Sequence, residues 1–254
     1  ASFANAFFGP DAALLFRYDA GGAIVPKPAY FAVANALGIT VLPPAGGPCA
    51  GNFGDVGSNN GACAAIEALS ARGIINGCDR AVAPPLFCPA DTTLRMQMAA
   101  LIVRAMPGWQ GETYANGFTD PPVPFDEELW RRVATLRQYG VVGGYNDCPA
   151  QGKTPPCYGP LDPVLKAQAI SFVTRAMVAK GYWQQQDTDR NLYGGALLGT
   201  GHERDATTYW YYTRARGGVP DYPEGGAFPT GEAARRHWFA RLLWVAIQGT
   251  PAAP

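Results

Sequence analysis

The chain has 254 residues, of which 48% are apolar and 16% are charged, a composition typical of a folded protein and not of a disordered one. Lysine and arginine together number 20, as do aspartate and glutamate, so no basic excess is present to follow a phosphate backbone. Apolar runs are interrupted well before the roughly 20 residues that a membrane-spanning helix needs. We therefore expect neither a nucleic-acid partner nor a transmembrane segment.

Residues 1–47 differ in pattern from the rest of the chain. An apolar stretch at 12–18 predicts an extended segment, and a predicted helix follows at 27–37, with Pro28 in its first turn and Gly38 after its end. The run LLFRYDAGGAIVPKPAYFAVANAL resembles the last strand and helix of xylanase-type (β/α)8 barrel glycosidases. The match is confined to this run, so the barrel is absent and no glycosidase activity follows. We expect a strand and a helix packed on the rest of the protein, followed by a proline- and glycine-rich linker.

The remainder of the chain repeats one plan, in which the second helix of each unit has apolar residues at the spacing of one helix face. The predicted stripe is Leu94, Met98, Leu101, Ile102 and Ala105 in the first unit, Leu165, Ala169, Phe172, Val173 and Ala176 in the second, and Phe239, Leu242, Leu243 and Ala246 in the third, where Arg235 interrupts it. We expect a mainly α fold with units at 48–110, 111–180 and 181–254, the last of them degenerate.

The first helix of the units also repeats, with an apolar pair followed by a glycine that can take the left-handed conformation ending a helix. The apolar pair and its glycine are Ile66, Leu69 and Gly73 in the first unit, and Val133, Leu136 and Gly140 in the second.

The six cysteines favour disulfides over a zinc site, because they are even in number and none forms a C-x-x-C pair. Several pairings are possible, but three close pairs each enclose a short loop: Cys49 with Cys63, Cys78 with Cys88, and Cys148 with Cys157. Disulfides persist in oxidising compartments, so we expect an extracellular location.

Several motifs in these units resemble the S-layer homology domain. The motifs are FGDV (53–56), GIING (73–77) and FCPADTTLRMQMA (87–99) in the first unit, and FTD (118–120), GVVGG (140–144) and GPLDPVLKAQA (159–169) in the second. The resemblance implies three tandem helical repeats forming a pseudo-threefold bundle. It also implies that the bundle binds cell-wall polysaccharide through grooves between neighbouring repeats and anchors proteins on the cell surface.

The candidate ligand residues follow from the family's threonine-arginine-alanine-glutamate motif. A basic residue is retained in all three units as Arg95, Lys166 and Arg236, whereas Gln97 and Gln168 stand where the family has glutamate. A cation at a helix start suits an anionic sugar substituent, such as a ketal-linked carboxylate, through charge-assisted hydrogen bonds. The alternative is that these cations pair with acids of the protein and only orient the bundle.

Three further residues are weaker candidates for ligand contacts. Asp55 and Asp120 could touch the ligand, but we favour a role as caps at the start of a helix. Trp130 could stack on a sugar ring, but we favour packing in the core.

No catalytic constellation is evident. The two histidines, His202 and His237, lie in no metalloprotease motif, and the chain has no nucleophile elbow or P-loop. His202, Glu203 and Asp205 could be imagined as an acid/base or metal cluster, but we expect a solvated loop there. The sequence therefore predicts a non-enzymatic protein without metal or cofactor.

Two functions remain open. The first is a surface anchor that binds a cell-wall polysaccharide. The second is a structural subunit of a surface layer, sheath or filament, in which the apolar N-terminal stretch AFFGPDAALLFRY pairs with a neighbouring subunit.

Overall fold

The computed structural model describes residues 51–57, 60–109, 117–145, 147–149, 152–190, 192–197, 199–222 and 228–248, and the backbone of 16–18 and 24–26. Strands β1 (Phe16–Tyr18) and β2 (Ile24–Pro26) pair antiparallel, with Arg17 opposite Val25. This confirms an extended conformation at the end of the stretch predicted at 12–18. The helix predicted at 27–37 lies outside the described residues.

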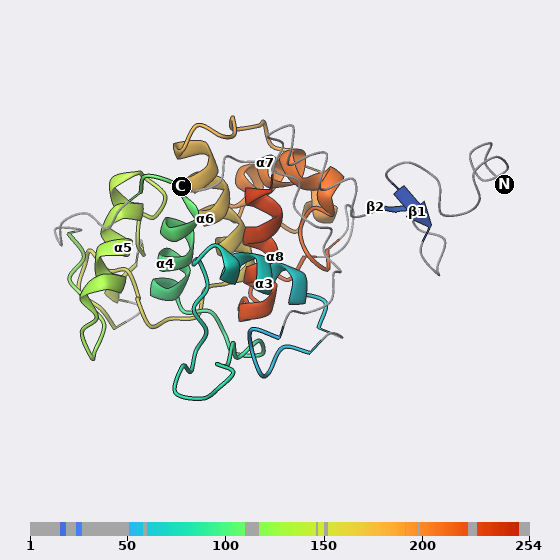
Figure 1. The fold of residues 1–254 in the computed structure, drawn as a ribbon. Helices are drawn as coiled ribbons and strands as arrows, with labels where there is room; N and C mark the ends of the chain where they lie inside the picture. Colours follow the sequence, from blue (N-terminus) through green and yellow to red (C-terminus); the bar gives the residue numbers. More distant parts are fainter. Residues whose placement is uncertain are drawn as a thin grey trace, which may run out of the picture.

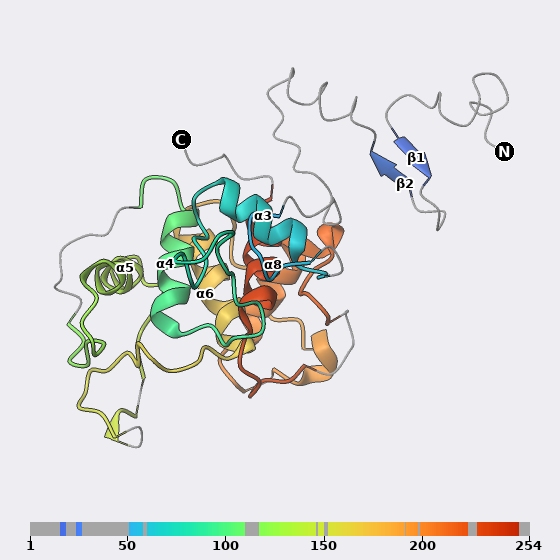
Figure 2. The same cartoon turned by 60° about the horizontal axis from the view of Figure 1, so that its bottom comes forward.

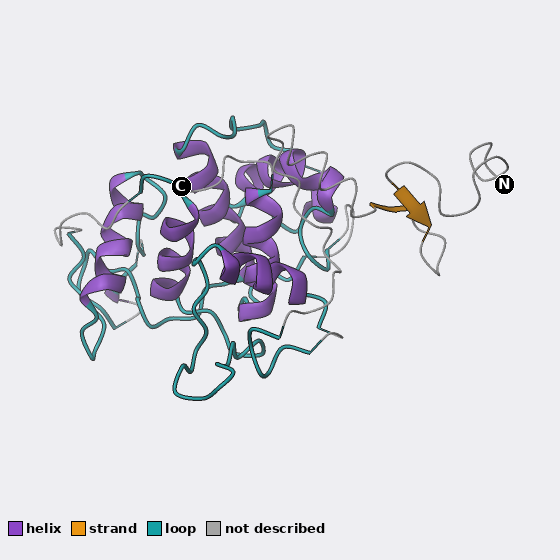
Figure 3. Ribbon diagram, in the orientation of Figure 1, coloured by secondary structure: helices purple, strands orange, loops and turns teal. Residues whose placement is uncertain are grey.

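Helices make up the body of the protein (Figures 1 and 3). They are α3 (Cys63–Ala71), α4 (Arg95–Ala105), α5 (Glu127–Gln138), α6 (Lys166–Ala179), α7 (Glu203–Thr213) and α8 (Arg236–Ile247), with 3-10 turns at Leu192–Gly195 and Arg214–Arg216. Helix α4 packs on α5, α6 packs on α7 and α8, and α3 packs on α8. In the described residues the fold is therefore mainly α, as predicted.

The predicted apolar stripes face the core within the helices, whereas Leu94 and Leu165, predicted as the first members of two stripes, directly precede α4 and α6 and are only partly buried. On α8, Phe239, Leu242, Leu243 and Ala246 are fully buried, and on α6 the equivalent buried residues are Ala169, Phe172, Val173 and Ala176. On α4, Met98, Ile102 and Ala105 are buried, whereas Leu101 packs against the core from a partly exposed position. These three helices consequently supply the centre of a common core (Figure 2).

The glycines predicted to end the first helices have the left-handed conformation that this role requires. Gly73 and Gly140 each have a φ of 68°. The residue after each glycine donates its N–H back into the helix, from Ile74 to the Leu69 carbonyl (3.0 Å) and from Val141 to the Leu136 carbonyl (2.8 Å). The chain therefore turns under the bundle directly after α3 and α5.

The segments that precede α4, α6 and α8 meet in a closed ring of backbone hydrogen bonds. Thr93 N–H donates to the Ala234 carbonyl (2.8 Å), Ala234 N–H donates to the Val164 carbonyl (2.8 Å), and Val164 N–H donates to the Thr93 carbonyl (2.9 Å). Because all three residues are buried, the ring satisfies backbone groups that water cannot reach. It fixes the starts of the three central helices around one point.

Two of the three predicted disulfides are present: Cys78 with Cys88, and Cys148 with Cys157. Cys63 is disulfide-bonded as well, but Cys49, its predicted partner, lies outside the described residues. Among the described helices, none combines the length and apolarity that crossing a membrane requires.

Candidate functional site

The three basic residues predicted for a ligand site each occupy the first position of a helix: Arg95 in α4, Lys166 in α6 and Arg236 in α8. Each backbone N–H donates to the carbonyl of an acidic residue far along the chain. The pairs are Arg95 to Asp162 (3.0 Å), Lys166 to Glu232 (2.8 Å) and Arg236 to Asp91 (2.8 Å). The backbones of the three positions are alike, so the surroundings of the side chains decide what each can do.

The guanidinium of Arg95 is enclosed by the protein, and the residue is only 2% exposed. Its Nε donates to the Tyr158 carbonyl (2.8 Å), and its Nη1 donates to Oε1 of Gln168 (3.3 Å). The rings of Tyr145, Tyr158 and Phe172 lie 4.7, 4.7 and 5.3 Å from the guanidinium carbon. Arg95 thus links α4 to α6 and to the segment at Tyr158, although no described carboxylate pairs with it as the structural alternative expected.

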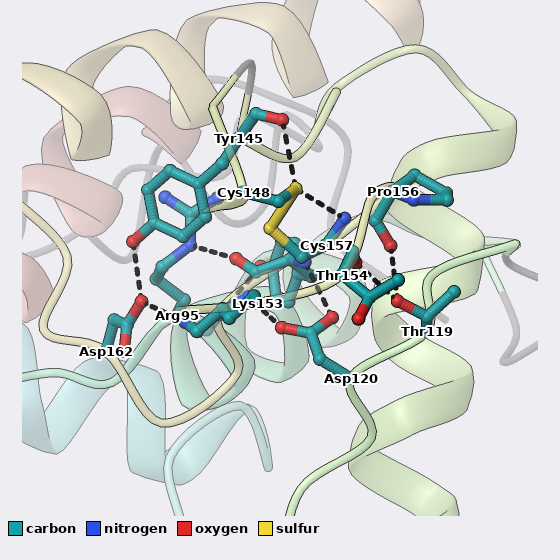
Figure 4. Close-up of a disulfide and its surroundings, with 12 residues drawn as sticks. Arg95, Thr119, Asp120, Tyr145, Cys148, Lys153, Thr154, Pro156, Cys157 and Asp162 are labelled. Carbon is teal, nitrogen blue, oxygen red and sulfur yellow. Dashed lines mark hydrogen bonds and ion pairs between the residues drawn. A yellow bond between two sulfur atoms is a disulfide. The ribbon is translucent and has the colours of Figure 1, made fainter. Parts of the chain in front are cut away.

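Tyr145, which precedes the disulfide between Cys148 and Cys157, lies over this guanidinium (Figure 4). Asp162 accepts hydrogen bonds from the Tyr145 hydroxyl (2.8 Å) and from Lys153 Nζ (2.6 Å), which hold the Tyr145 ring in place. Burial, together with the bond to Asp162, raises the pKa of Tyr145 to about 12, so the phenol stays protonated at neutral pH. The Tyr145 ring is thus one of three aromatic rings that enclose the guanidinium.

Lys166 is also occupied, but by a carboxylate of the same chain. Its Nζ donates to Glu232 Oε1 (2.7 Å) and to the Tyr222 hydroxyl (2.6 Å), and it lies 4.8 Å from the Tyr222 ring centre and 5.3 Å from that of Trp238. The hydrogen bond from Lys166 lowers the pKa of Glu232. Burial opposes the charge of Lys166, but its bonds to Glu232 and Tyr222 outweigh that effect and raise the lysine pKa.

This ion pair predicts a pH-dependent contribution to stability. The folded-state pKa of Glu232 lies below its ordinary value of 4.5, so the pair stabilises the folded protein above that value and its contribution is lost as the pH falls through the lowered pKa. Glu232→Gln should lower the free energy of unfolding at pH 7 by less than about 1 kcal/mol, because the carboxylate is half exposed. Urea unfolding should show that the free energies of unfolding of the wild-type protein and of Glu232→Gln become equal in acid. A difference that stays the same in acid would contradict a stabilising ion pair between Lys166 and Glu232.

Arg236 differs from the other two cations, because its terminal nitrogens form no hydrogen bond or ion pair with any described residue. Its Nε donates to the Phe87 carbonyl (2.8 Å), and its guanidinium carbon lies 5.0 Å from the Phe87 ring centre. Burial lowers the pKa of Arg236, with Asp91 and Asp55 opposing the shift, and an arginine remains charged at neutral pH nonetheless. The charge is therefore available to a ligand.

A pocket of about 340 Å³ lies at this arginine, between α4, the start of α5 and the turn that follows α3. Arg236 and Gln97 line it together with Asn76 and Arg80. The side-chain nitrogen of Gln97 and the terminal nitrogens of Arg80 also have no hydrogen-bond partner in the described part of the chain. The pocket thus presents several donors that a bound anion could use.

The side of the pocket nearest α5 has a positive side chain, a negative side chain and an apolar side chain. Arg104 Nη2 lies 2.9 Å from Glu128 Oε1, and this ion pair joins α4 to α5. The apolar side chain of Leu101 lines the same pocket. Bonding to Arg104 is the main cause that lowers the pKa of Glu128. Glu128 is consequently an acceptor at neutral pH, and it lines the same pocket as the unpaired donors.

The two glutamines predicted as ligand contacts, Gln97 and Gln168, each bind a backbone group at the start of a helix. Gln97 Oε1 accepts from the Leu94 N–H (3.2 Å), and Gln168 Oε1 accepts from the Leu165 N–H (3.2 Å), so each satisfies a backbone donor at the start of its helix. Their remaining atoms differ in role, because Gln97 lines the pocket whereas Gln168 contacts the buried Arg95.

The prediction that Asp55 and Asp120 cap helices is wrong. The Asp55 carboxylate accepts from the N–H groups of Phe87 and Cys88, each at 2.7 Å, and Asp120 accepts from those of Tyr158 (2.7 Å) and Gly159 (2.8 Å). Each aspartate thus binds the loop that precedes the second helix of its unit. Asp126 caps α5 instead, by accepting from the Leu129 N–H (2.9 Å). Through Phe87, Asp55 supports Arg236 indirectly.

Trp130 lies in the core, as the packing alternative predicts. It is 5% exposed and packs near Phe118 and Tyr158, with ring centres 6.5 and 6.4 Å away. A sugar ring could not stack on it without opening the core.

The segment at His202 is not the solvated loop that we expected. His202 directly precedes α7, where Asp205 is buried and accepts from Arg175 Nε (2.8 Å), and His202 Nδ1 lies 2.8 Å from Ser171 Oγ. Burial lowers the pKa of His202. These contacts join α6 to α7, and no group of three metal-ligating side chains occurs among the residues that the structure describes.

Sequence reasoning missed several pocket residues. Asn76 belongs to the GIING motif, so comparison of the repeat motifs could have indicated it. No motif marks Arg80, Arg104 or Glu128. The packing of α4 on α5 brings Arg104 and Glu128 together, so their pairing cannot be found from residues close in sequence.

Comparison with known proteins leaves the family unassigned: no protein-family model and no curated protein matches this sequence.

Proposed function

We propose that the chain consists of three repeats of the S-layer homology type, at 48–110, 111–180 and 181–254, arranged about a pseudo-threefold axis. The ring joining Thr93, Val164 and Ala234 supports this arrangement, because each residue stands in the same relation to the next. The equivalent bonds from Arg95, Lys166 and Arg236 to the acidic residues also join each proposed repeat to the next, in the opposite direction around the axis.

The proposed function is a non-catalytic cell-surface anchor that binds an anionic cell-wall polysaccharide in the pocket at Arg236. One observation carries it: Arg236, Gln97 and Arg80 converge on this pocket with donors that no described residue uses. A carboxylate placed there would receive charge-assisted hydrogen bonds, which are stronger than neutral ones. The first turn of α8 adds the favourable field of a helix N-terminus.

The remainder of the pocket suits a saccharide. Its volume lies at the lower end of the range for small-molecule sites. Glu128 offers an acceptor for sugar hydroxyls, and Leu101 offers an apolar surface for the face of a ring. The disulfides agree with an extracellular location, where such a polymer would be encountered.

Sedimentation with isolated bacterial cell walls tests the function. The protein should pellet with intact walls but remain in solution with walls stripped of their attached polysaccharide. Amidation of the wall carboxylates by a carbodiimide and an amine should also abolish pelleting, because it removes the anion. Equal binding to amidated walls would overturn the proposed ligand chemistry. Pelleting without walls would instead favour self-assembly, the alternative based on the N-terminal stretch, whose side chains lie outside the described residues.

A further inference from the structure

The three acidic residues whose carbonyls accept the N–H groups of the basic positions differ in the contacts of their side chains. Asp91 and Glu232 both accept, through their backbone carbonyls, the N–H of a helix-starting cation. The Glu232 side chain also bonds the cation itself, on Lys166. Among the described residues, no carboxylate forms an ion pair with Arg236, although Asp91 stands in the equivalent place.

We propose that Glu232 is an internal ligand, whose carboxylate fills on Lys166 a second anion-binding site equivalent to the open one at Arg236. This inference rests on the proposed function, since it takes the Arg236 pocket as the model of an open site. Removal of the Glu232 carboxylate is expected to convert the closed position into one that binds the carboxylate of a sugar acid.

The surroundings of Lys166 are those of a built carboxylate site. The ammonium is held in place by the Tyr222 hydroxyl and by the rings of Tyr222 and Trp238. The Lys166 side chain is 7% exposed, whereas that of Glu232 is 48% exposed, so the glutamate covers the lysine from the solvent side. Truncating Glu232 would therefore leave a cation that faces water and keeps its hydrogen bond to the Tyr222 hydroxyl, while the hydrogen that Glu232 accepted becomes free for another acceptor.

The Arg95 position does not offer the same possibility. Its guanidinium is bonded to the Tyr158 carbonyl and to Gln168, and no carboxylate of the described residues is bonded to it. Three rings enclose it, so no acidic side chain can be removed to free it. The inference is thus specific to Lys166.

An NMR titration with sodium D-glucuronate, a free sugar carboxylate, tests this inference. In the wild-type protein, ¹H–¹⁵N shifts should be confined to the Arg236 pocket. In Glu232→Ala, a second set of shifted signals should appear at the Lys166 amide and the Trp238 indole N–H. Glucuronate should bind at Lys166 at least about ten times more tightly in this variant than in the wild-type protein, an increase equal to about 1.4 kcal/mol. The indole is a suitable reporter because it is held by the Pro220 carbonyl at 2.9 Å.

Glu127→Ala is the matched control. It removes an exposed carboxylate that pairs with Arg131 on α5, so the net charge changes equally while Lys166 stays covered. A folded Glu232→Ala protein without the second set of shifts would overturn the inference, as would the same second set in Glu127→Ala. If Glu232→Ala folds poorly, Glu232→Ser replaces it in the same titration. Absence of shifts at Arg236 in every protein would count against the proposed function alone, because the Lys166 signals are read separately.

Discussion

Replacing Arg236 by alanine is expected to weaken binding to cell-wall polysaccharide about 10- to 100-fold. Hydrogen bonds to a charged group contribute about 1.5–3 kcal/mol, which corresponds to that range of affinity. The free energy of unfolding should fall by less than the free energy of binding, since the Arg236 side chain makes one hydrogen bond with the described residues, to the Phe87 carbonyl. Wall sedimentation over a range of protein concentrations, combined with urea unfolding, measures the two effects.

Arg241→Ala provides the control for this experiment. Arg241 lies on the same helix and pairs with Asp221 at 2.6 Å, but it does not line the pocket. Its replacement removes an equal charge and should leave wall binding unchanged. Equal losses in Arg236→Ala and Arg241→Ala would show that a general positive charge, and not the pocket, is responsible.

Replacing Arg95 by alanine should affect stability more than wall binding, with a loss of about 3 kcal/mol in the free energy of unfolding. The change leaves the buried Tyr158 carbonyl without its Nε–H donor and removes a side chain that packs against three rings. Urea unfolding measures the loss. Wall binding per folded molecule should be retained, because the guanidinium is already enclosed.

Arg131→Ala is the stability control for that variant. Arg131 is a partly exposed arginine that pairs with Glu127 one helical turn away at 2.7 Å, and such pairs contribute about 0.3–0.5 kcal/mol. A stable Arg95→Ala protein with weakened wall binding would reverse our assignment and place the ligand at Arg95.

Local patterns predicted much of the fold correctly. The stripe on α8, the glycines after α3 and α5, and two disulfides depend on residues close in sequence, so periodicity and short loops suffice to find them. The caps were predicted wrongly for the converse reason. Asp55 and Asp120 precede helices, but their carboxylates bind N–H groups more than thirty residues later in the chain.

The sequence by itself determined that a cation starts α4, α6 and α8, because that depends on a motif only a few residues long. Only the tertiary structure decided how each of the three cations is surrounded. Arg95 is covered by Tyr145 and Lys166 by Glu232, side chains that approach from distant loops, while Arg236 lines a pocket. A cation's availability depends on the groups that surround it in space, and these come together only when the chain has folded.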